Sequence, residues 1–338
     1  MTKNKLIAIL GSSIVLILII VFWVVNQPTS VSEIPKQRAF SVGLAISGKL
    51  GDKSYNDLTY NGFMRAAKEL GLATTVVEPA ESAEVRLILS KLARDGVELI
   101  VGIGFTARQP ITDLAQKYPN TNFLLVDDVI DPPLPNVRSV HFREQEAGFL
   151  AGVVAALMTE TGKVGVVAGI DLPVVRRYVN GYKDGVRYIN PSGIVLINFA
   201  GSFSDPAKGK QLSHGLYSAG ADVLLNGAGQ TGNGIFAAAK IDKKYAIGVD
   251  LDQSNQAPEN ILTSVLKRVD VAIYTAVKDA INNKFESGTA SLGVSDGAID
   301  LAPLNENIVP LTVRKKVNDV IVAIKRGDIK VVANYEAP

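Results

Sequence analysis

The chain of 338 residues contains no cysteine. This absence excludes disulfide bonds, thiolate metal sites and cysteine nucleophiles. It also excludes a lipid-modified cysteine, so the chain is not expected to be a conventional lipoprotein. Histidine is nearly as scarce, because only His141 and His214 occur and they do not have the spacing of metal ligands. A histidine-built zinc site or a catalytic triad is therefore not expected, and the sequence predicts no metal and no cofactor.

An excess of charge of one sign is also missing. The 35 lysine and arginine residues nearly balance the 33 acidic residues, which gives a net charge of +2. Since no block of basic residues occurs, nucleic acid is not expected as a partner. Hydrophobic residues make up 47% of the chain and charged residues 20%, which is typical of packed globular proteins, and the length suits two domains.

The N-terminus carries the clearest local signal. Lys3 and Lys5 precede an uncharged, mostly apolar run over residues 6–25. About twenty residues at a helical rise of roughly 1.5 Å cover about 30 Å, enough to span a bilayer. We expect an uncleaved signal anchor over residues 1–27, with a cleaved signal peptide as the alternative, and a linker over residues 28–38. The two lysines predict that the body of the chain lies on the extracytoplasmic side of the membrane.

From residue 40 onward, short apolar runs alternate with amphipathic helical patterns. Nearly continuous apolar runs bounded by glycine or aspartate are typical of strands buried on both faces of a parallel sheet. The expected strands are 41–47, 99–102, 122–126, 164–168, 195–199, 223–226 and 245–249. The expected helices are 61–70, 83–93, 109–117 and 148–158, with a further helix near 307–325. This alternation predicts a doubly wound α/β fold.

The chain also repeats itself weakly. An Asn-Gly-aromatic triplet opens helical patterns at residue 61 and again at 180, which is 119 residues later. Residues 95–100 resemble residues 219–224, and Asp127 and Asp250 follow valine at positions 123 residues apart. Three matches at nearly one offset predict two similar lobes. In open parallel sheets ligands bind beyond the carboxyl ends of the strands, so function is expected in a crevice between the lobes.

The segment after the first expected strand offers polar groups and one ring just before a helix. Ser54, Tyr55, Asn56 and Asp57 are the ligand-binding candidates in this segment. The alternative is a loop whose Asn56 or Asp57 caps the next helix. After the expected strand 99–102, Phe105 follows two glycines and is either a cleft residue or part of the core.

Four further side chains stand at or near the ends of later strands. The Asp127 carboxylate can accept two hydrogen bonds from vicinal hydroxyls such as those of a ribose, and Phe203 can stack on a flat ligand. Asp250 can accept N–H bonds from the edge of a heterocycle, and Lys267 can balance its charge. The alternatives are a capping role for Asp127, a core position for Phe203 and a structural salt bridge for Lys267.

Residues 227–232 match the glycine fingerprint of dinucleotide-binding sites, and Asp250 lies 18 residues after Gly232. That fingerprint normally opens a domain, whereas here it lies late in the chain, so an oxidoreductase rests on this motif alone. No Gly-x-Ser-x-Gly elbow surrounds Ser202 or Ser213. We therefore expect a binding protein and not an enzyme.

Several segments together resemble the basic membrane protein family of ABC-transporter substrate-binding proteins, which includes bacterial purine-nucleoside receptors. The segments that carry the resemblance are 51–57, 117–120, 123–127, 146–152, 201–205, 229–234, 248–253 and 263–267. The resemblance implies a type I periplasmic-binding-protein fold, with two Rossmann-like lobes of parallel sheet, three hinge crossings and a closing cleft. It places one lobe at residues 39–141 plus about 268–300 and the other at 142–267 plus about 301–338.

The resemblance also implies roles for individual residues. Phe203 is similar to the ring that stacks on the base, Asp250 to the carboxylate that reads the base edge, and Lys267 to the lysine beside it. The groups near the sugar would be Asn56 with Asp57, and Asp127, and Gly229 would bring backbone to the ligand. Tyr55 stands where the family often has phenylalanine, which adds a hydroxyl.

The expected function is thus import of a nucleoside, with a purine nucleoside favoured, through ABC permease subunits by a monomeric protein anchored to the cell membrane. A binding protein for a sugar or another small metabolite, and a membrane-anchored ligand-sensing protein, are the alternatives.

Overall fold

The computed structural model describes residues 39–79 and 82–333. The predicted signal anchor over residues 1–27 and the linker over 28–38 lie outside these residues. Among the helices that the structure does describe, none combines the length and the hydropathy needed to cross a membrane.

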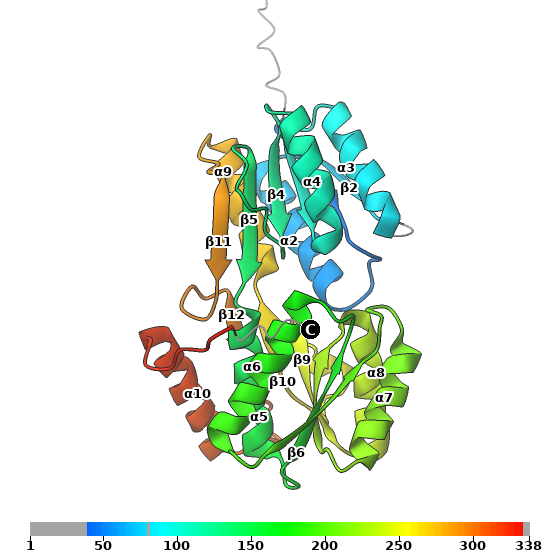
Figure 1. Ribbon diagram of the computed structural model, residues 1–338, viewed down its shortest axis with the longest axis vertical. Coiled ribbons are helices and arrows are strands. Elements are labelled where there is room, and N and C mark those ends of the chain that lie inside the picture. Colours follow the sequence, from blue (N-terminus) through cyan, green and yellow to red (C-terminus); the bar gives the residue numbers. More distant parts are fainter. Residues whose placement is uncertain (1–38, 80–81, 334–338) are drawn as a thin grey trace, which may run out of the picture. The chain divides into compact units, whose positions relative to one another are not determined.

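The first sheet has six strands in the order β11-β5-β4-β3-β1-β2, and every neighbouring pair is parallel (Figure 1). The strands are β1 (Ser41–Ala45), β2 (Ala73–Val77), β3 (Leu99–Ile103), β4 (Asn122–Val126), β5 (Val137–Phe142) and β11 (Gly288–Leu292). The three central strands β1, β3 and β4 are almost entirely buried, as their continuous apolar sequences predict.

The second sheet has six strands in the order β12-β10-β9-β8-β6-β7, of which only β12 is antiparallel to its neighbour. Its strands are β6 (Lys163–Ala168), β7 (Ile194–Phe199), β8 (Val223–Gly227), β9 (Tyr245–Asp250), β10 (Ile261–Lys267) and β12 (Ile299–Leu301). These two sheets confirm the predicted α/β fold built on parallel sheets.

Helices cover both faces of each sheet. They are α2 (Tyr55–Leu70), α3 (Val85–Arg94), α4 (Phe105–Lys117), α5 (Glu144–Met158), α6 (Pro173–Ile189), α7 (Pro206–Ser218), α8 (Asn233–Asp242), α9 (Val269–Ile281) and α10 (Leu311–Arg326). Short 3-10 turns are η1 (Ser82–Glu84), η2 (Gly229–Gly232) and η3 (Ser254–Gln256). Helices α3 and α4 share a buried cluster with one face of the first sheet, and α2 packs with α9. Helices α7 and α8 bury one face of the second sheet, and α5 contacts its strands β8, β10 and β12 (Figure 1).

The two sheets repeat one construction. The first five strands of each sheet, counted along the chain, have the same spatial order. The second strand lies at the edge, and the first, third, fourth and fifth follow it. The buried Asn136 side chain donates to the carbonyls of residues 115, 118 and 121 that lead into β4. Asn260, 124 residues later, donates in the same way to the carbonyls of residues 239 and 244 that lead into β9. The offset agrees with the repeat predicted from the sequence.

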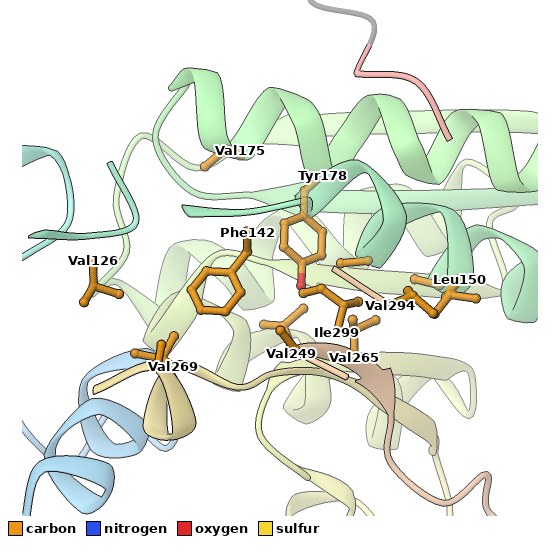
Figure 2. Packing of buried hydrophobic residues seen from close by; sticks show 14 of the residues in the cluster. Val126, Phe142, Leu150, Val175, Tyr178, Val249, Val265, Val269, Val294 and Ile299 are labelled. Carbon is orange, nitrogen blue, oxygen red and sulfur yellow. The ribbon is translucent and has the colours of Figure 1, made fainter. Parts of the chain in front are cut away.

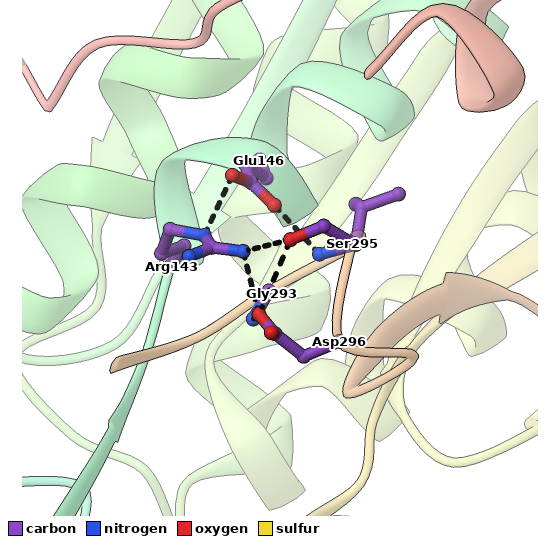
Figure 3. Close-up of polar contacts among 6 residues, drawn as sticks. Arg143, Glu146, Gly293, Ser295 and Asp296 are labelled. Atoms are coloured by element: carbon purple, nitrogen blue, oxygen red, sulfur yellow. Dashed lines mark hydrogen bonds and ion pairs between the residues drawn. The ribbon is translucent and has the colours of Figure 1, made fainter. Parts of the chain in front are cut away.

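The chain passes between the sheets after β5, after β10 and between β11 and β12. An ionic cluster ties the first of these segments to the third (Figure 3). The Arg143 guanidinium lies 2.7 Å from Glu146 and 2.6 Å from Asp296, and it donates to the Ser295 hydroxyl at 2.7 Å. Glu146 in turn accepts from the backbone N–H of Val294 at 2.6 Å. The two crossings are therefore held together as one connection.

Helices α5 and α6 pack unusually closely because glycines face backbone at four positions. A Cβ atom on Gly148 would lie 2.0 Å from the carbonyl oxygen of Tyr178, and one on Gly181 would lie 2.1 Å from that of Gln145. Tyr178 belongs to the buried hydrophobic cluster that extends from the first sheet into the second and includes Phe142 (Figure 2). This close contact holds α5 against α6.

Most predicted elements are found with small shifts. The predicted strand 122–126 matches β4, and the predicted helix 61–70 begins six residues early, at Tyr55. Strands β2, β5, β10, β11 and β12 were not predicted. Exposure explains β2, whose first three residues are exposed at a sheet edge, and the antiparallel β12 has only three residues.

Candidate functional site

The carboxyl ends of β4 and β10 bring two of the predicted residues together. Lys267, the last residue of β10, places its Nζ 2.5 Å from Oδ1 and 2.6 Å from Oδ2 of Asp127, directly after β4. Asp127 and Asp250 both have a positive φ, 70° and 69°, which turns the chain sharply at the strand end. The cost of that conformation at a residue other than glycine is often found at functional sites.

Lys267 lies in a closed ionic and aromatic environment. Its side chain is only 4% exposed, and its Nζ lies 3.4 Å from Glu144, a carboxylate with no exposed surface. The rings of Tyr55 and Phe142 also lie near the ammonium, at 5.4 Å and 5.1 Å from their centroids. Burial disfavours the charged lysine, but Asp127, Glu144 and Asp250 outweigh it and raise the pKa of Lys267. The lysine is therefore a fixed positive charge at neutral pH.

Asp250 is the last residue of β9, and it contacts the loop that precedes α2 in the part of the chain that forms the first sheet. Its carboxylate accepts a hydrogen bond from the Ser54 hydroxyl. Burial raises the pKa of Asp250 to about 6, against the opposing effects of Lys267 and Ser54. The side chain thus carries an ionised carboxylate at neutral pH at an energetic cost, and carboxylates of this kind are candidates for functional sites.

The loop before α2 is organised by two carboxylates. Asp52 is 5% exposed and accepts from the backbone N–H groups of Ser54, Asn56 and Asp57. Asp57 accepts from the N–H groups of residues 51 and 53, at 2.7 and 2.9 Å. The Asn56 amide oxygen accepts from the Ser47 hydroxyl at 3.1 Å. Asp57 therefore has both oxygens engaged in holding the loop. The Ser54 hydroxyl instead reaches Asp250, and the Tyr55 ring lies beside Lys267.

Phe203 is held in place by glycines. A Cβ atom on Gly169, just after β6, would lie 2.2 Å from the Phe203 ring, so only glycine permits this position of the ring. Gly229 has φ +55° and lies against the same phenylalanine, and the N–H of Thr231 donates to the Phe203 carbonyl at 3.1 Å. The ring is partly exposed at the carboxyl edge of the second sheet.

The glycine fingerprint at residues 227–232 has a packing explanation. It forms the end of β8 and η2 and leads into α8, the strand-turn-helix context that the sequence indicates. A Cβ atom on Gly232 would lie 2.0 Å from the amide oxygen of Asn226. These glycines allow the turn to pack on its own strand and on Phe203, and this close packing accounts for them without a dinucleotide.

Phe105 is the first residue of α4, after Gly104 with φ +73°. Its side chain is 50% exposed, and its role in ligand binding stays a prediction.

Three residues near the cluster were missed by sequence reasoning. Glu144 accepts from the Arg177 side chain at 2.7 Å and contacts Lys267, and the Tyr178 hydroxyl is buried without a hydrogen-bond partner among the described residues. Burial raises the pKa of Tyr178, with Asp250, Glu144 and Asp127 contributing. The missing signal was β5: its residues Arg138 and His141 interrupt the apolar run, so the strand end that precedes Glu144 was not recognised.

Two hollows on the described surface lie elsewhere. One of about 260 Å³ lies between β2 and α3 and is lined by Val77, Leu87 and Lys91 among others, and one of about 190 Å³ lies beside Lys240 and Asn260. Neither hollow is lined by Lys267 or by the carboxylates near it, Asp127, Glu144 and Asp250. Within residues 39–79 and 82–333, no group of three or more histidines and acidic residues is placed to hold a metal ion. The candidate site therefore rests on the side chains gathered at the strand ends, where the two sheets contact each other.

The chain matches known proteins over most of its length. The family model described as "ABC transporter substrate-binding protein PnrA-like" matches residues 39–334. A Pyrococcus furiosus protein named "Uncharacterized lipoprotein" is 36% identical over 75% of this chain and 67% of its own length. The "ABC transporter nucleoside-binding protein BmpA" of Lactococcus lactis is 31% identical over 75% of this chain and 78% of its own.

Among solved structures, an ABC transporter solute-binding protein of Aeropyrum pernix has a TM-score of 0.81 and 31% identity, covering 88% of this chain and 94% of the other. The resemblance predicted from the sequence is thereby confirmed. With the family model matching nearly all of the described residues, the chain belongs to the PnrA-like family of ABC transporter substrate-binding proteins, the basic membrane protein family.

Proposed function

We propose that this substrate-binding protein takes a nucleoside, with a purine nucleoside favoured, between the carboxyl ends of its two sheets. The observation that carries the proposal is the meeting of Asp127 and Lys267 from opposite sheets, with Asp250 and the glycine-held Phe203 at the same strand ends. An aromatic face, a carboxylate for N–H groups and a carboxylate–lysine pair for hydroxyls match the parts of a base joined to a sugar. The Lactococcus relative's name, nucleoside-binding protein, supports the same assignment.

In this proposal Phe203 stacks on the base and Asp250 accepts hydrogen bonds from its edge. Asp127 and Lys267 address the sugar hydroxyls, and Ser54 and Tyr55 approach from the loop of the first sheet. The ligand favours the closed arrangement because groups of both sheets contact it, so binding shifts an open–closed equilibrium. No step makes or breaks a covalent bond, and the protein acts as a carrier and not as an enzyme.

The proposed setting is the outer side of the cell membrane, where the closed protein delivers its ligand to ABC permease subunits. A relative is named a lipoprotein, but this chain has no cysteine to carry a lipid. We propose that the apolar run over residues 6–25 supplies the anchor instead.

Isothermal titration tests the ligand and the residues together. The ligands are purine and pyrimidine nucleosides, the free bases, ribose and NAD, and the variants are Phe203→Ala and Asp250→Ala. Each variant should lose affinity about tenfold or more, because stacking and charge-assisted hydrogen bonds each contribute about 1–3 kcal/mol and a factor of ten corresponds to about 1.4 kcal/mol. Tyr188→Ala is the matched aromatic control, since Tyr188 is 51% exposed near the end of α6.

Two results would count against the proposal. Tight binding of ribose alone, with no gain from an attached base, would make the protein a sugar receptor. Folded Phe203→Ala and Asp250→Ala variants with the affinity of the unmodified protein would remove these residues from the site.

A further inference from the structure

The loop that precedes α2 makes three successive contacts with residues of the second sheet's half. The Asp52 carbonyl accepts from the Asn233 amide at 3.4 Å, and the Lys53 carbonyl accepts from the Gln253 amide at 2.9 Å. The next residue, Ser54, donates to Asp250. Two of the three contacts use backbone carbonyls, so the loop is recognised by its conformation and not only by its side chains.

Gln253 is held in the orientation that lets its amide donate to the Lys53 carbonyl. Its side chain is fully buried, and its Oε1 accepts from the N–H of Val249 at 2.9 Å. The Gln253 N–H donates to the Ser264 hydroxyl at 3.0 Å, which holds the residue at its own backbone. Because Oε1 must face an N–H donor, Nε2 must point the other way, toward the Lys53 carbonyl. The amide has no freedom to turn, and its donor is aimed across to the first sheet's loop.

The conformation of the loop is fixed on its own side as well. Lys53 has φ +54°, and its N–H donates to the Asp57 carboxylate, which also accepts from Gly51. Asp52 holds the N–H groups of the residues that follow. The Lys53 carbonyl is therefore fixed one residue before Ser54 and two before Tyr55, both predicted to bind the ligand.

We propose that Gln253 is a positioning residue for ligand binding: it holds the loop 52–54 in the closed arrangement, and Asn233 assists it. Gln253 acts through the loop, so it sets the closed fraction and the ligand dissociation rate without touching the ligand. The inference deepens the proposed function, since it takes this loop as part of the ligand site. A buried amide–carbonyl bond of ordinary net strength corresponds to roughly a fivefold change in an equilibrium constant.

Two substitutions at Gln253 separate the donor from the packing. Gln253→Met keeps the length of the side chain and removes both polar atoms. Gln253→Glu keeps an acceptor for Val249 but turns the donor into a second acceptor that faces the Lys53 carbonyl, which should open the protein more strongly. Asn255→Ala is the matched control, because Asn255 is exposed in the adjacent turn η3.

The absence of cysteine makes the closed fraction directly measurable. Cysteines introduced at the exposed positions Lys117 in α4 and Lys240 in α8 carry spin labels, one for each sheet. Electron–electron distance measurements are made on the full chain in nanodiscs without added ligand. We expect the ratio of closed to open protein to fall about fivefold in Gln253→Met and further in Gln253→Glu, and to stay unchanged in Asn255→Ala.

The second measurement is ligand dissociation by stopped flow, for the nucleoside that binds best to the unmodified protein. We expect faster dissociation of both Gln253 variants by about the same factor as the loss of closure, with association nearly unchanged. The distance measurement needs no ligand, so a shift in the distances without nucleoside binding would keep this inference and reject the nucleoside.

Folded Gln253 variants with the distance distribution of the unmodified protein would overturn the inference. If substitution of the buried Gln253 prevents folding, Asn233→Ala decides the matter, because Asn233 is only partly buried. A smaller loss of closure in that variant supports the inference, and an unchanged distribution overturns it.

Discussion

The carboxylate of Asp250 should destabilise the protein that it serves. Its pKa is raised from 3.8 to about 6, chiefly by burial, which means that the folded protein holds the proton more tightly than the unfolded chain does. Below about pH 4 both states are protonated and the group has no effect. As the pH rises through 6 the folded state must ionise a buried group, so this contribution to stability falls. A shift of about two pKa units corresponds to about 3 kcal/mol at neutral pH.

Asp250→Asn removes the charge and keeps the shape and an acceptor for Ser54. We expect the variant to be more stable than the unmodified protein by up to about 3 kcal/mol at pH 7.5, with the advantage shrinking as the pH falls from 6 to 4. Urea unfolding followed by circular dichroism at pH 7.5 and pH 4.5, without ligand, measures both differences. Asp252→Asn, at an exposed carboxylate two residues later, should change stability by less than about 0.5 kcal/mol.

A variant that is less stable at pH 7.5, or equally more stable at both pH values, would refute this reasoning. The first result would mean that Lys267 and Ser54 outweigh burial, and the second that the gain comes from packing and not from charge. The expected result would show a carboxylate kept at a cost to stability, as function often requires.

Four other outcomes follow from the same contacts. On the role proposed for Asp250, ligand affinity should fall as the pH drops below about 6, because the carboxylate then loses the charge that would accept N–H bonds, and titration at pH 5 and 7.5 measures it. Lys267→Met should lower the free energy of unfolding by about 3–5 kcal/mol, since two buried carboxylates lose their cation, and urea titration would show it. Gly148→Ala should cost about 2–4 kcal/mol by forcing α5 from α6, whereas Gly215→Ala in α7, with open space around it, should stabilise by about 0.5–1 kcal/mol; an equal effect of both would contradict the packing account. Arg143→Met should cost about 1–2 kcal/mol in the same assay and Arg143→Lys less, because lysine keeps the charge but not the two-armed contact.

Many strands of this fold can be predicted directly from continuous apolar runs in the sequence. Strands β3, β4, β8 and β9 are buried on both faces, so their continuous hydrophobic sequences identify them. Strand β10 has the sequence ILTSVLK, in which two hydroxyl residues and a lysine interrupt the run, although the strand is almost fully buried. Its polar side chains are used internally: Thr263 donates to the Ala302 carbonyl and Ser264 accepts from Gln253. Such tertiary partners cannot be read from one segment alone.

The candidate site divides in the same way. Ends of recognised strands directed attention to Asp127 and Asp250, and the structure places both beside Lys267 or Ser54. Glu144 follows a strand that was not recognised and was missed. For Asp57, the sequence does not distinguish a ligand contact from a contact within the loop, because a carboxylate at the start of a helix can serve either purpose. The structure shows two backbone partners for it.

One polar atom beside the strand ends has no partner, and it bears on how closure is controlled. Among the described residues, the Tyr178 hydroxyl is buried without a hydrogen-bond partner. Such an atom costs about 1–3 kcal/mol when removed from water, which opposes closure. The Lys267–Asp127 pair and the Gln253–Lys53 contact favour closure by amounts of the same order. In the proposed function, a ligand that offers a partner to the Tyr178 hydroxyl would therefore decide a nearly balanced equilibrium between the open and closed arrangements.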